Sequence, residues 1–323
     1  MVVADVVRLA VQGTVAALLL THTAQIWQLV VLQAIAGTAT AFFNLAATGL
    51  TPMTVSAPRL QEANALRGMS QAAMGIAGPA LAGLLVVTVG PGYALAIDAA
   101  TFAVSAFYLA RLRLGAHVTL PPQSFARDLR DGWREFVKRT WVWVIVLGAS
   151  IGNMMSGVWY VLGAAFTKAS HGGAGAWTVI LVANSVGALV GGTLALRLRP
   201  FHPLLSAVLF LGAVVLPGSL FALKAPWELI AFGVLLTGLG SMLFNTIWET
   251  TLQQHVPPQA LSRVSAYDWF GSLLCQPIGL ALAGPAAVAI GRSPTLWVSA
   301  AVSGLMVVLM LATPSVRRLE AAA

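Results

Sequence analysis

The scarcest feature of this sequence is charge. Asp, Glu, Lys and Arg make up 9% of its 323 residues, whereas a soluble domain carries roughly 25%. Hydrophobic residues make up 58%, and the mean hydropathy is +0.85. A water-soluble fold of this size cannot bury so much apolar surface, but a bilayer accepts it because lipid surrounds the protein. The composition therefore excludes a soluble domain and predicts a membrane protein.

Cysteine and the motifs of catalysis are also scarce. Cys275 is alone, which excludes a disulfide within the chain, and its apolar neighbours suggest a small buried residue. The five histidines are scattered, without the spacing of a metal site. The sequence contains neither a Walker A motif nor a Gly-x-Gly-x-x-Gly motif. We therefore expect no enzyme, no nucleotide-driven pump, no metal ion and no cofactor.

A basic patch is missing too, although the net charge is +8. The Lys and Arg residues fall in short loops between apolar runs, with no interleaved aromatic residues. This pattern argues against a nucleic-acid partner.

Long apolar runs fill most of the chain. A membrane helix needs about 20 mostly apolar residues to cross a ~30 Å hydrocarbon core. Ten segments meet this condition, near residues 2–20, 26–50, 68–89, 92–111, 140–163, 174–196, 203–222, 227–252, 264–287 and 294–312. The fold class we expect is all-α, with four helices in residues 1–112, a linker at 113–139 and six helices in 140–323.

The basic residues predict an orientation. If the first helix runs outward from the cytoplasm, fourteen of the eighteen Lys and Arg residues lie on the cytoplasmic side. Three lie outside, namely Lys168, Lys224 and Arg292, and Arg8 lies within a helix. Adding or removing one helix in the middle would scramble this division. We therefore expect both termini in the cytoplasm of a cell with this chain in its plasma or inner membrane.

The longest polar stretch is predicted to hold an amphipathic helix. Phe125, Leu129, Trp133 (or Gly132) and Phe136 share one helical face, and charged residues occupy the other. We expect this helix to lie on the cytoplasmic surface between two domains. A solvated connector is the simpler interpretation.

Small residues and prolines recur in two helices about 200 residues apart, in a weak internal repeat. Gly75, Gly78 and Gly83 have spacings that allow close helix packing, and Pro79 removes a backbone donor. Pro277 lies in the corresponding helix of the second half. These residues are candidates for gating, and plain packing is the alternative.

Ionisable residues inside a bilayer are expensive and indicate a partner or a cavity. Asp5 and Arg8 are three residues apart, so they share a helical face and can pair. Asp98, Glu249 and Asp268 also lie within predicted spans. A proton-coupled carrier needs a carboxylate that gains and loses a proton as its conformation changes. All five are candidates for proton coupling, with Glu249 and Asp98 preferred, and the alternative for each is an interfacial or salt-bridged side chain.

Aromatic and amide residues within the spans are candidates for lining a substrate cavity. They suit apolar or cationic organic molecules, although hydrogen bonding between helices competes as an explanation. These residues are Gln71, Asn153, Trp159, Tyr160, Asn245 and Trp248.

Six short stretches, in their order along the chain, resemble a known family. They are residues 5–8, 62–66, 78–83, 96–102, 128–133 and 252–257, the last followed by 262–264. Together they resemble the major facilitator superfamily, in particular its drug-exporter branch with macrolide-efflux and siderophore-exporter relatives. The resemblance implies two helical halves that rock about a central site, with proton uptake driving export.

The chain departs from the family pattern at its beginning. Members have twelve helices with the linker after helix six, whereas here it follows the fourth predicted helix. The resemblance therefore predicts that the first two helices and their Gly-x-x-x-Asp-Arg loop are absent, through a late-called start or a real truncation.

The function expected from this resemblance is proton-coupled efflux of small amphipathic molecules. The expected partners are the lipid bilayer, a small-molecule substrate and protons, with no obligatory protein partner. A lipid flippase or solute importer of the same fold, and a non-transporting remnant, remain alternatives.

Overall fold

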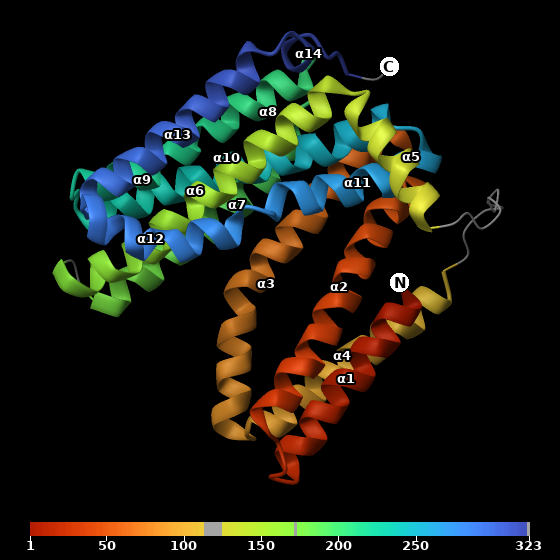
Figure 1. Ribbon diagram of the computed structural model, residues 1–323. Coiled ribbons are helices and arrows are strands. Elements are labelled where there is room, and N and C mark those ends of the chain that lie inside the picture. Colours follow the sequence, from red (N-terminus) through yellow and green to blue (C-terminus); the bar gives the residue numbers. More distant parts are fainter. Residues whose placement is uncertain (113–124, 171–172, 322–323) are drawn as a thin grey trace. The chain divides into compact units, whose positions relative to one another are not determined.

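The computed structural model describes residues 1–112, 125–170 and 173–321, and within these ranges the chain is helical without strands. Its elements are α1 (Val2–Leu20), α2 (Ile26–Thr54), η1 (Ala57–Arg59), α3 (Leu60–Thr88), α4 (Pro91–Ala110), α5 (Phe125–Val137), α6 (Thr140–Ser170), α7 (Gly173–Ala195), α8 (Pro203–Leu211), η2 (Gly212–Val214), α9 (Val215–Ala222), α10 (Trp227–His255), α11 (Pro258–Leu273), α12 (Gln276–Ile290), α13 (Arg292–Ala312) and α14 (Pro314–Arg317) (Figure 1). Ten spans among the described residues are long and apolar enough to cross a membrane, which confirms the expected number.

The contacts between residues divide the chain into two compact units. The first unit holds Met1–Ser56 and Met74–Pro122, and the second holds Ala57–Ala73 and Gln123–Ala323. The boundary falls within α3, so the N-terminal part of this helix packs with the second unit. The division at residues 112 and 140 expected from the sequence stays a prediction.

The first unit is built around α1. This helix packs against α2 and α4, and the side chains that it buries recur every three or four residues from Ala4 to Val15. The buried face is narrow, because Val3 and Val6 on the other side are exposed. Such exposed valines suit a lipid-facing surface.

The second unit is built around α10, the most buried of the candidate spans. It runs beside α7, and a Cβ atom added at Gly238 would overlap the backbone oxygen of Asn184. Helices in a bilayer gain no hydrophobic free energy by leaving lipid, so close van der Waals contact through small residues holds them together. Gly238 therefore allows the backbones of α7 and α10 to touch.

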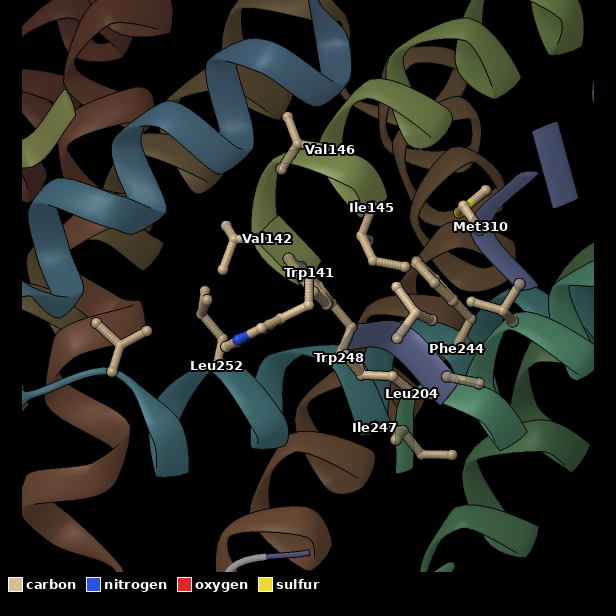
Figure 2. Packing of buried hydrophobic residues seen from close by; sticks show 14 of the residues in the cluster. Trp141, Val142, Ile145, Val146, Leu204, Phe244, Ile247, Trp248, Leu252 and Met310 are labelled. Atoms are coloured by element: carbon tan, nitrogen blue, oxygen red, sulfur yellow. The ribbon is translucent and has the colours of Figure 1, made fainter. Parts of the chain in front are cut away.

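A cluster of large side chains closes one end of the second unit (Figure 2). Trp141 of α6 and Trp248 of α10 meet edge to face with their ring centroids 5.6 Å apart. Leu204 of α8 and Met310 of α13 pack in the same cluster. The helices α6, α8 and α13 are thereby tied to α10, which holds Trp248 and its neighbours in place.

Prolines interrupt two of the expected spans. The span expected at 264–287 is divided into α11 and α12, because Pro277 cannot donate to the carbonyl of Leu273, where α11 ends. The span at 203–222 is divided into α8, η2 and α9. Pro217 cannot donate to the carbonyl of Ala213, and the Thr237 hydroxyl donates to that oxygen instead, at 2.8 Å.

The expected helix of the linker is present as α5. Gly132 and Phe136 are buried against α11, and the Phe136 ring lies 5.8 Å from that of Tyr267. Trp133 also contacts Tyr267, although half of its surface is exposed. The side chains of Phe125 and Leu129 lie outside the described residues. The described part of α5 therefore packs on the protein through Gly132 and Phe136.

Candidate functional site

The second unit encloses a cavity of about 510 Å³ between α6, α7, α10, α11 and α13. Pockets of this size hold small organic molecules. Seven residues proposed from the sequence lie in its wall: the amides Asn153 and Asn245, the aromatic residues Trp159, Tyr160 and Trp248, and the carboxylates Glu249 and Asp268. The structure thus brings together residues that lie more than a hundred positions apart in the chain.

Asp268 is buried in this wall, with 9% of its surface exposed. The indole N–H of Trp248 donates to one carboxylate oxygen at 3.1 Å, and the Ser272 hydroxyl donates to the other at 3.3 Å. Among the described residues no ion pair involves Asp268. Its partners are therefore neutral donors, which orient the carboxylate without neutralising its charge.

Glu249 has a different environment, although it lines the same cavity. One guanidinium nitrogen of Arg67 lies 2.6 and 2.7 Å from the two oxygens of Glu249. Both side chains remain partly exposed, at 30% for Arg67 and 20% for Glu249. The charge of Glu249 is therefore balanced within the described structure, whereas that of Asp268 is not.

Arg67 reaches Glu249 because the N-terminal part of α3 docks on α10. One turn before it, the Asn64 amide donates to Thr250 Oγ1 at 3.0 Å and to Gln253 Oε1 at 2.9 Å. These partners are spaced three or four residues apart on each helix, so they form one row of polar contacts. The row continues at Gln61, whose amide nitrogen donates to the carbonyl oxygens of Ala195 and Leu198 at the end of α7.

The remaining cavity candidates differ in how they are held. The Asn153 amide donates to the carbonyl of Ser272 at 2.9 Å, which joins α6 to α11. Trp159 is buried, and its indole N–H has no hydrogen-bond partner among the described residues. Tyr160 and Asn245 are more exposed. Trp159 thus has a buried indole N–H without a described partner, whereas the Asn153 amide N–H is already engaged.

Four other polar candidates are not among the residues that line the cavity. Gln71 is exposed on α3 and does not line it. Asp98, Asp5 and Arg8 belong to the first unit. Arg8 donates to Asp5, as their spacing predicted, and the Ser105 hydroxyl donates to the second oxygen of Asp5 at 2.7 Å. This arrangement satisfies Asp5 within the unit.

The residues proposed for gating lie on two helices. Gly75 is exposed on α3, and a Cβ atom added at Gly78 or Gly83 would meet no atom within 4 Å. The side chain of Pro79 lies outside the described residues, and α3 continues through this position. Pro277 lies in the first turn of α12. Gating by these residues stays a prediction.

The sequence analysis did not identify Ser272 or Arg67 as residues of the site. Ser272 lies one turn after Asp268, and Arg67 was assigned only to a basic loop. A polar residue one turn along the same helix as a buried acid is a usable signal for Ser272. Arg67 and Glu249 are 182 positions apart, and no local pattern predicts their contact.

The cavity wall also contains residues of a stretch that matches the Gly-x-Ser-x-Gly motif of serine hydrolases. Residues 148–152 read Gly-Ala-Ser-Ile-Gly. In those enzymes the serine sits on a sharp turn between a strand and a helix. Here the five residues lie within α6, and Ser150 is buried, so the pattern does not form that turn. Within the described residues, no three His, Cys, Asp or Glu side chains gather as metal ligands.

Comparison with known proteins decides the family. The model of the Major Facilitator Superfamily matches residues 5–280 of this sequence. The chain belongs to the major facilitator superfamily. This membership makes it a multi-pass protein of a transporter family and not an enzyme.

Two curated members of the superfamily are similar in sequence. The uncharacterized MFS-type transporter y4rN of Sinorhizobium fredii is 25% identical over 242 residues, which are 73% of this chain and 59% of that protein. The multidrug efflux pump Tap of Mycobacterium tuberculosis is 29% identical over 231 residues, which are 68% of this chain and 54% of Tap. The chain thus spans little more than half the length of these relatives.

A solved structure of the superfamily has a similar fold. It is the crystal structure of a bacterial homologue of the iron transporter ferroportin in an outward-facing state, with a TM-score of 0.75 and 16% identity. The match covers 95% of this chain and 81% of that one. At this identity the likeness confirms the fold of the superfamily and nothing about the substrate.

Proposed function

We propose that the chain acts in the efflux of small amphipathic molecules by alternating access, driven by proton uptake. The observation that carries the proposal is the cavity of the second unit, whose wall combines aromatic rings, amides and the carboxylate of Asp268. Rings and amides suit a molecule with apolar and polar parts. The name of Tap, a multidrug efflux pump, supports efflux over other kinds of transport.

Proton coupling is assigned to Asp268 in preference to the other candidates. Glu249 and Asp5 each accept a hydrogen bond from an arginine, which stabilises the charged form. Asp268 accepts only from Trp248 and Ser272 among the described residues. Binding or releasing a proton therefore changes the net charge of the cavity wall at Asp268. Such a change alters the affinity of the wall for a charged or dipolar substrate.

The proposed location is the cell membrane, with both termini in the cytoplasm. A contact of the C-terminal residues supports the proposal that basic residues gather at one end of the second unit. The Ala321 N–H donates to the carbonyl of Phe201. This contact places the C-terminus beside the loop that holds Arg197 and Arg199. Lys224 follows the C-terminal end of α9 and Arg292 is the first residue of α13, so both lie at the other end of the second unit. Gathering of basic residues at one end agrees with the positive-inside rule.

The test is transport in proteoliposomes that contain the full chain. Uptake of a fluorescent amphipathic cation is measured in vesicles whose pH gradient drives antiport, with and without a protonophore. We expect uptake that depends on the gradient, and we expect Asp268→Asn to abolish that dependence. The variant should keep its melting temperature, because the amide oxygen still accepts from Trp248.

The matched control is Glu228→Gln. Glu228 is an exposed acid on α10, the helix that bears Glu249, and it does not line the cavity. We expect this variant to transport like the unmodified chain. Gradient-independent uptake, or equal loss in both variants, would contradict the assignment. Uptake against the expected direction would favour an importer. Movement of labelled lipid between the leaflets would favour a flippase. A stable chain without any transport would favour a non-transporting remnant.

A further inference from the structure

A second pocket lies in the second unit, at the helix ends opposite to the basic loops. Its volume is about 590 Å³, and it shares no lining residue with the cavity described above. Phe166 of α6, Phe221 of α9 and Leu296 of α13 form its apolar floor, and Phe221 and Leu296 are buried. Lys224 and Arg292 are the basic residues of its rim. The pocket thus combines an apolar surface with two cations.

Neither cation has an acidic partner among the residues that the structure describes. Both Lys224 and Arg292 are exposed. Arg292 opens α13, and the first turn of this helix contains no acidic residue. A cation at a helix N-terminus is unfavourable, because the free N–H groups there carry partial positive charge. An anion bound at this place would remove the conflict.

The backbone turn at Lys224 ends α9 and fixes this residue at the rim of the pocket. Its φ angle is 54°, in the left-handed region that favours glycine. The Ala225 N–H donates to Leu220 O at 3.0 Å and the Lys224 N–H to Phe221 O at 3.0 Å, so this turn is a Schellman motif. His22 has the same conformation after α1, so the turn explains the position of Lys224 and is not itself a sign of a ligand.

One hydrogen bond holds the two sides of the rim together. The Ser293 hydroxyl donates to the carbonyl of Ala222 at 2.8 Å, which joins the first turn of α13 to the end of α9. Lys224 follows Ala222 by two residues, and Arg292 precedes Ser293. Both cations are therefore anchored close to this bond, at the rim of one pocket.

We propose that this pocket binds the phosphate group of an anionic phospholipid. The phosphodiester lies between Lys224 and Arg292 near the N-terminus of α13, and the glycerol and the first part of an acyl chain contact the apolar floor. The ends of membrane helices lie at the depth of lipid headgroups, where the charge of a Lys or Arg attracts the phosphate of an anionic lipid. Inorganic phosphate has the same charge chemistry but makes no use of Phe166, Phe221 and Leu296.

The test is native mass spectrometry of the full chain in detergent, titrated with phosphatidylglycerol, phosphatidylcholine or inorganic phosphate. We expect phosphatidylglycerol to bind in preference to phosphatidylcholine. The double variant Lys224→Gln/Arg292→Gln should bind phosphatidylglycerol about tenfold more weakly. The matched control is Arg317→Gln/Arg318→Gln, which removes two exposed cations at α14 and should bind like the unmodified chain.

The variant Lys224→Gly separates binding from folding. It keeps the Schellman turn and relieves the left-handed residue, so we expect an equal or higher melting temperature together with weaker lipid binding. Unchanged phosphatidylglycerol binding in Lys224→Gly and the double variant would overturn the proposal. Equal weakening in the Arg317/Arg318 control, or equal binding of the two lipids, would overturn it as well. Displacement of the lipid by millimolar inorganic phosphate would assign the pocket to free phosphate instead.

Discussion

Asp5 in the first unit and Asp268 in the second are both buried acids inside membrane spans, yet their surroundings differ. Asp5 has no exposed surface, and it accepts from Arg8 and Ser105. The Arg8 guanidinium in turn lies 4.2 Å from the ring centroid of Phe43 and 4.6 Å from that of Phe102. Asp268 accepts from two neutral donors and lines a cavity.

The difference shows how a membrane protein uses the same residue type for structure and for a site. Arg8 and its two aromatic neighbours neutralise Asp5 and fill the space around it, which ties α1 to α2 and α4. Asp268 has space beside it and a charge that its described neighbours do not balance. A buried acid such as Asp268, with a cavity beside it and no cation to balance it, is the better candidate for binding and proton exchange.

The largest effect is expected from breaking the pair in the first unit. Arg8→Leu leaves Asp5 buried without a cation, which should lower the free energy of unfolding by about 3–5 kcal/mol. Thermal unfolding of the purified chain in detergent measures the change. The double variant Asp5→Asn/Arg8→Leu removes both charges and should recover most of the stability. A double variant as unstable as Arg8→Leu would show that packing of Arg8, and not the charge pair, stabilises this unit.

A smaller effect is expected from closing the space between two backbones of the second unit. A Cβ atom at Gly279 would overlap the carbonyl oxygen of Met154, so Gly279→Ala must push α12 away from α6. We expect a loss of about 1–3 kcal/mol in the free energy of unfolding. Gly83→Ala in the first unit is the matched control, since its added methyl group meets no neighbour. Equal losses in the two variants would contradict this account.

The ion pair between Arg67 and Glu249 should contribute less than the Asp5 pair, because both of its side chains are partly exposed. A double-mutant cycle of Arg67→Gln and Glu249→Gln, measured by thermal unfolding, should give a coupling of about 1 kcal/mol or less. A cycle of Arg199→Gln and Glu62→Gln, a more exposed pair, serves as the lower reference. A coupling as large as that of the buried pair would show that α3 docks more tightly than the exposure indicates.

The smallest effect is expected at an acid outside the membrane spans. Hydrogen bonds from Lys138 at 2.7 Å and Arg139 at 2.8 Å lower the pKa of Glu135 from its usual value. Because the pKa is lower in the folded chain, this stabilisation is present above the usual carboxyl pKa and is lost as the pH falls through the lowered value. We expect a contribution of about 0.5 kcal/mol at neutral pH. Melting temperatures of the unmodified chain and Glu135→Gln, measured from pH 7 downward, should converge in acid.

Features that depend on neighbours in the chain were predictable from the sequence. The ten spans follow from runs of apolar residues, and the pair of Asp5 and Arg8 follows from a spacing of three. The helix break was missed because Pro277 was weighed as a packing residue and not as a missing donor to Leu273. Its position after an apolar run was visible, so the signal existed.

Features that depend on contact between distant helices were not predictable. Glu249 and Asp268 have the same charge and both lie beside a tryptophan in the sequence, yet Arg67 reaches only Glu249. The choice depends on where the N-terminal part of α3 docks on α10, through Asn64 and its partners. Five of the six cavity candidates named from the sequence, and two of the proton-coupling candidates, line the cavity, but their common wall required the packing of α6, α10 and α11.

The sequence by itself determined that this chain is a membrane protein, how many candidate spans its described part contains and which neighbouring charges pair. Transfer into lipid is a sum over consecutive residues, so order and composition suffice to predict it. Only the tertiary structure decided which buried acid meets an arginine and which faces a cavity. Those outcomes depend on how helices far apart in the chain rotate and approach, and close packing of small residues such as Gly238 and Gly279 sets that approach.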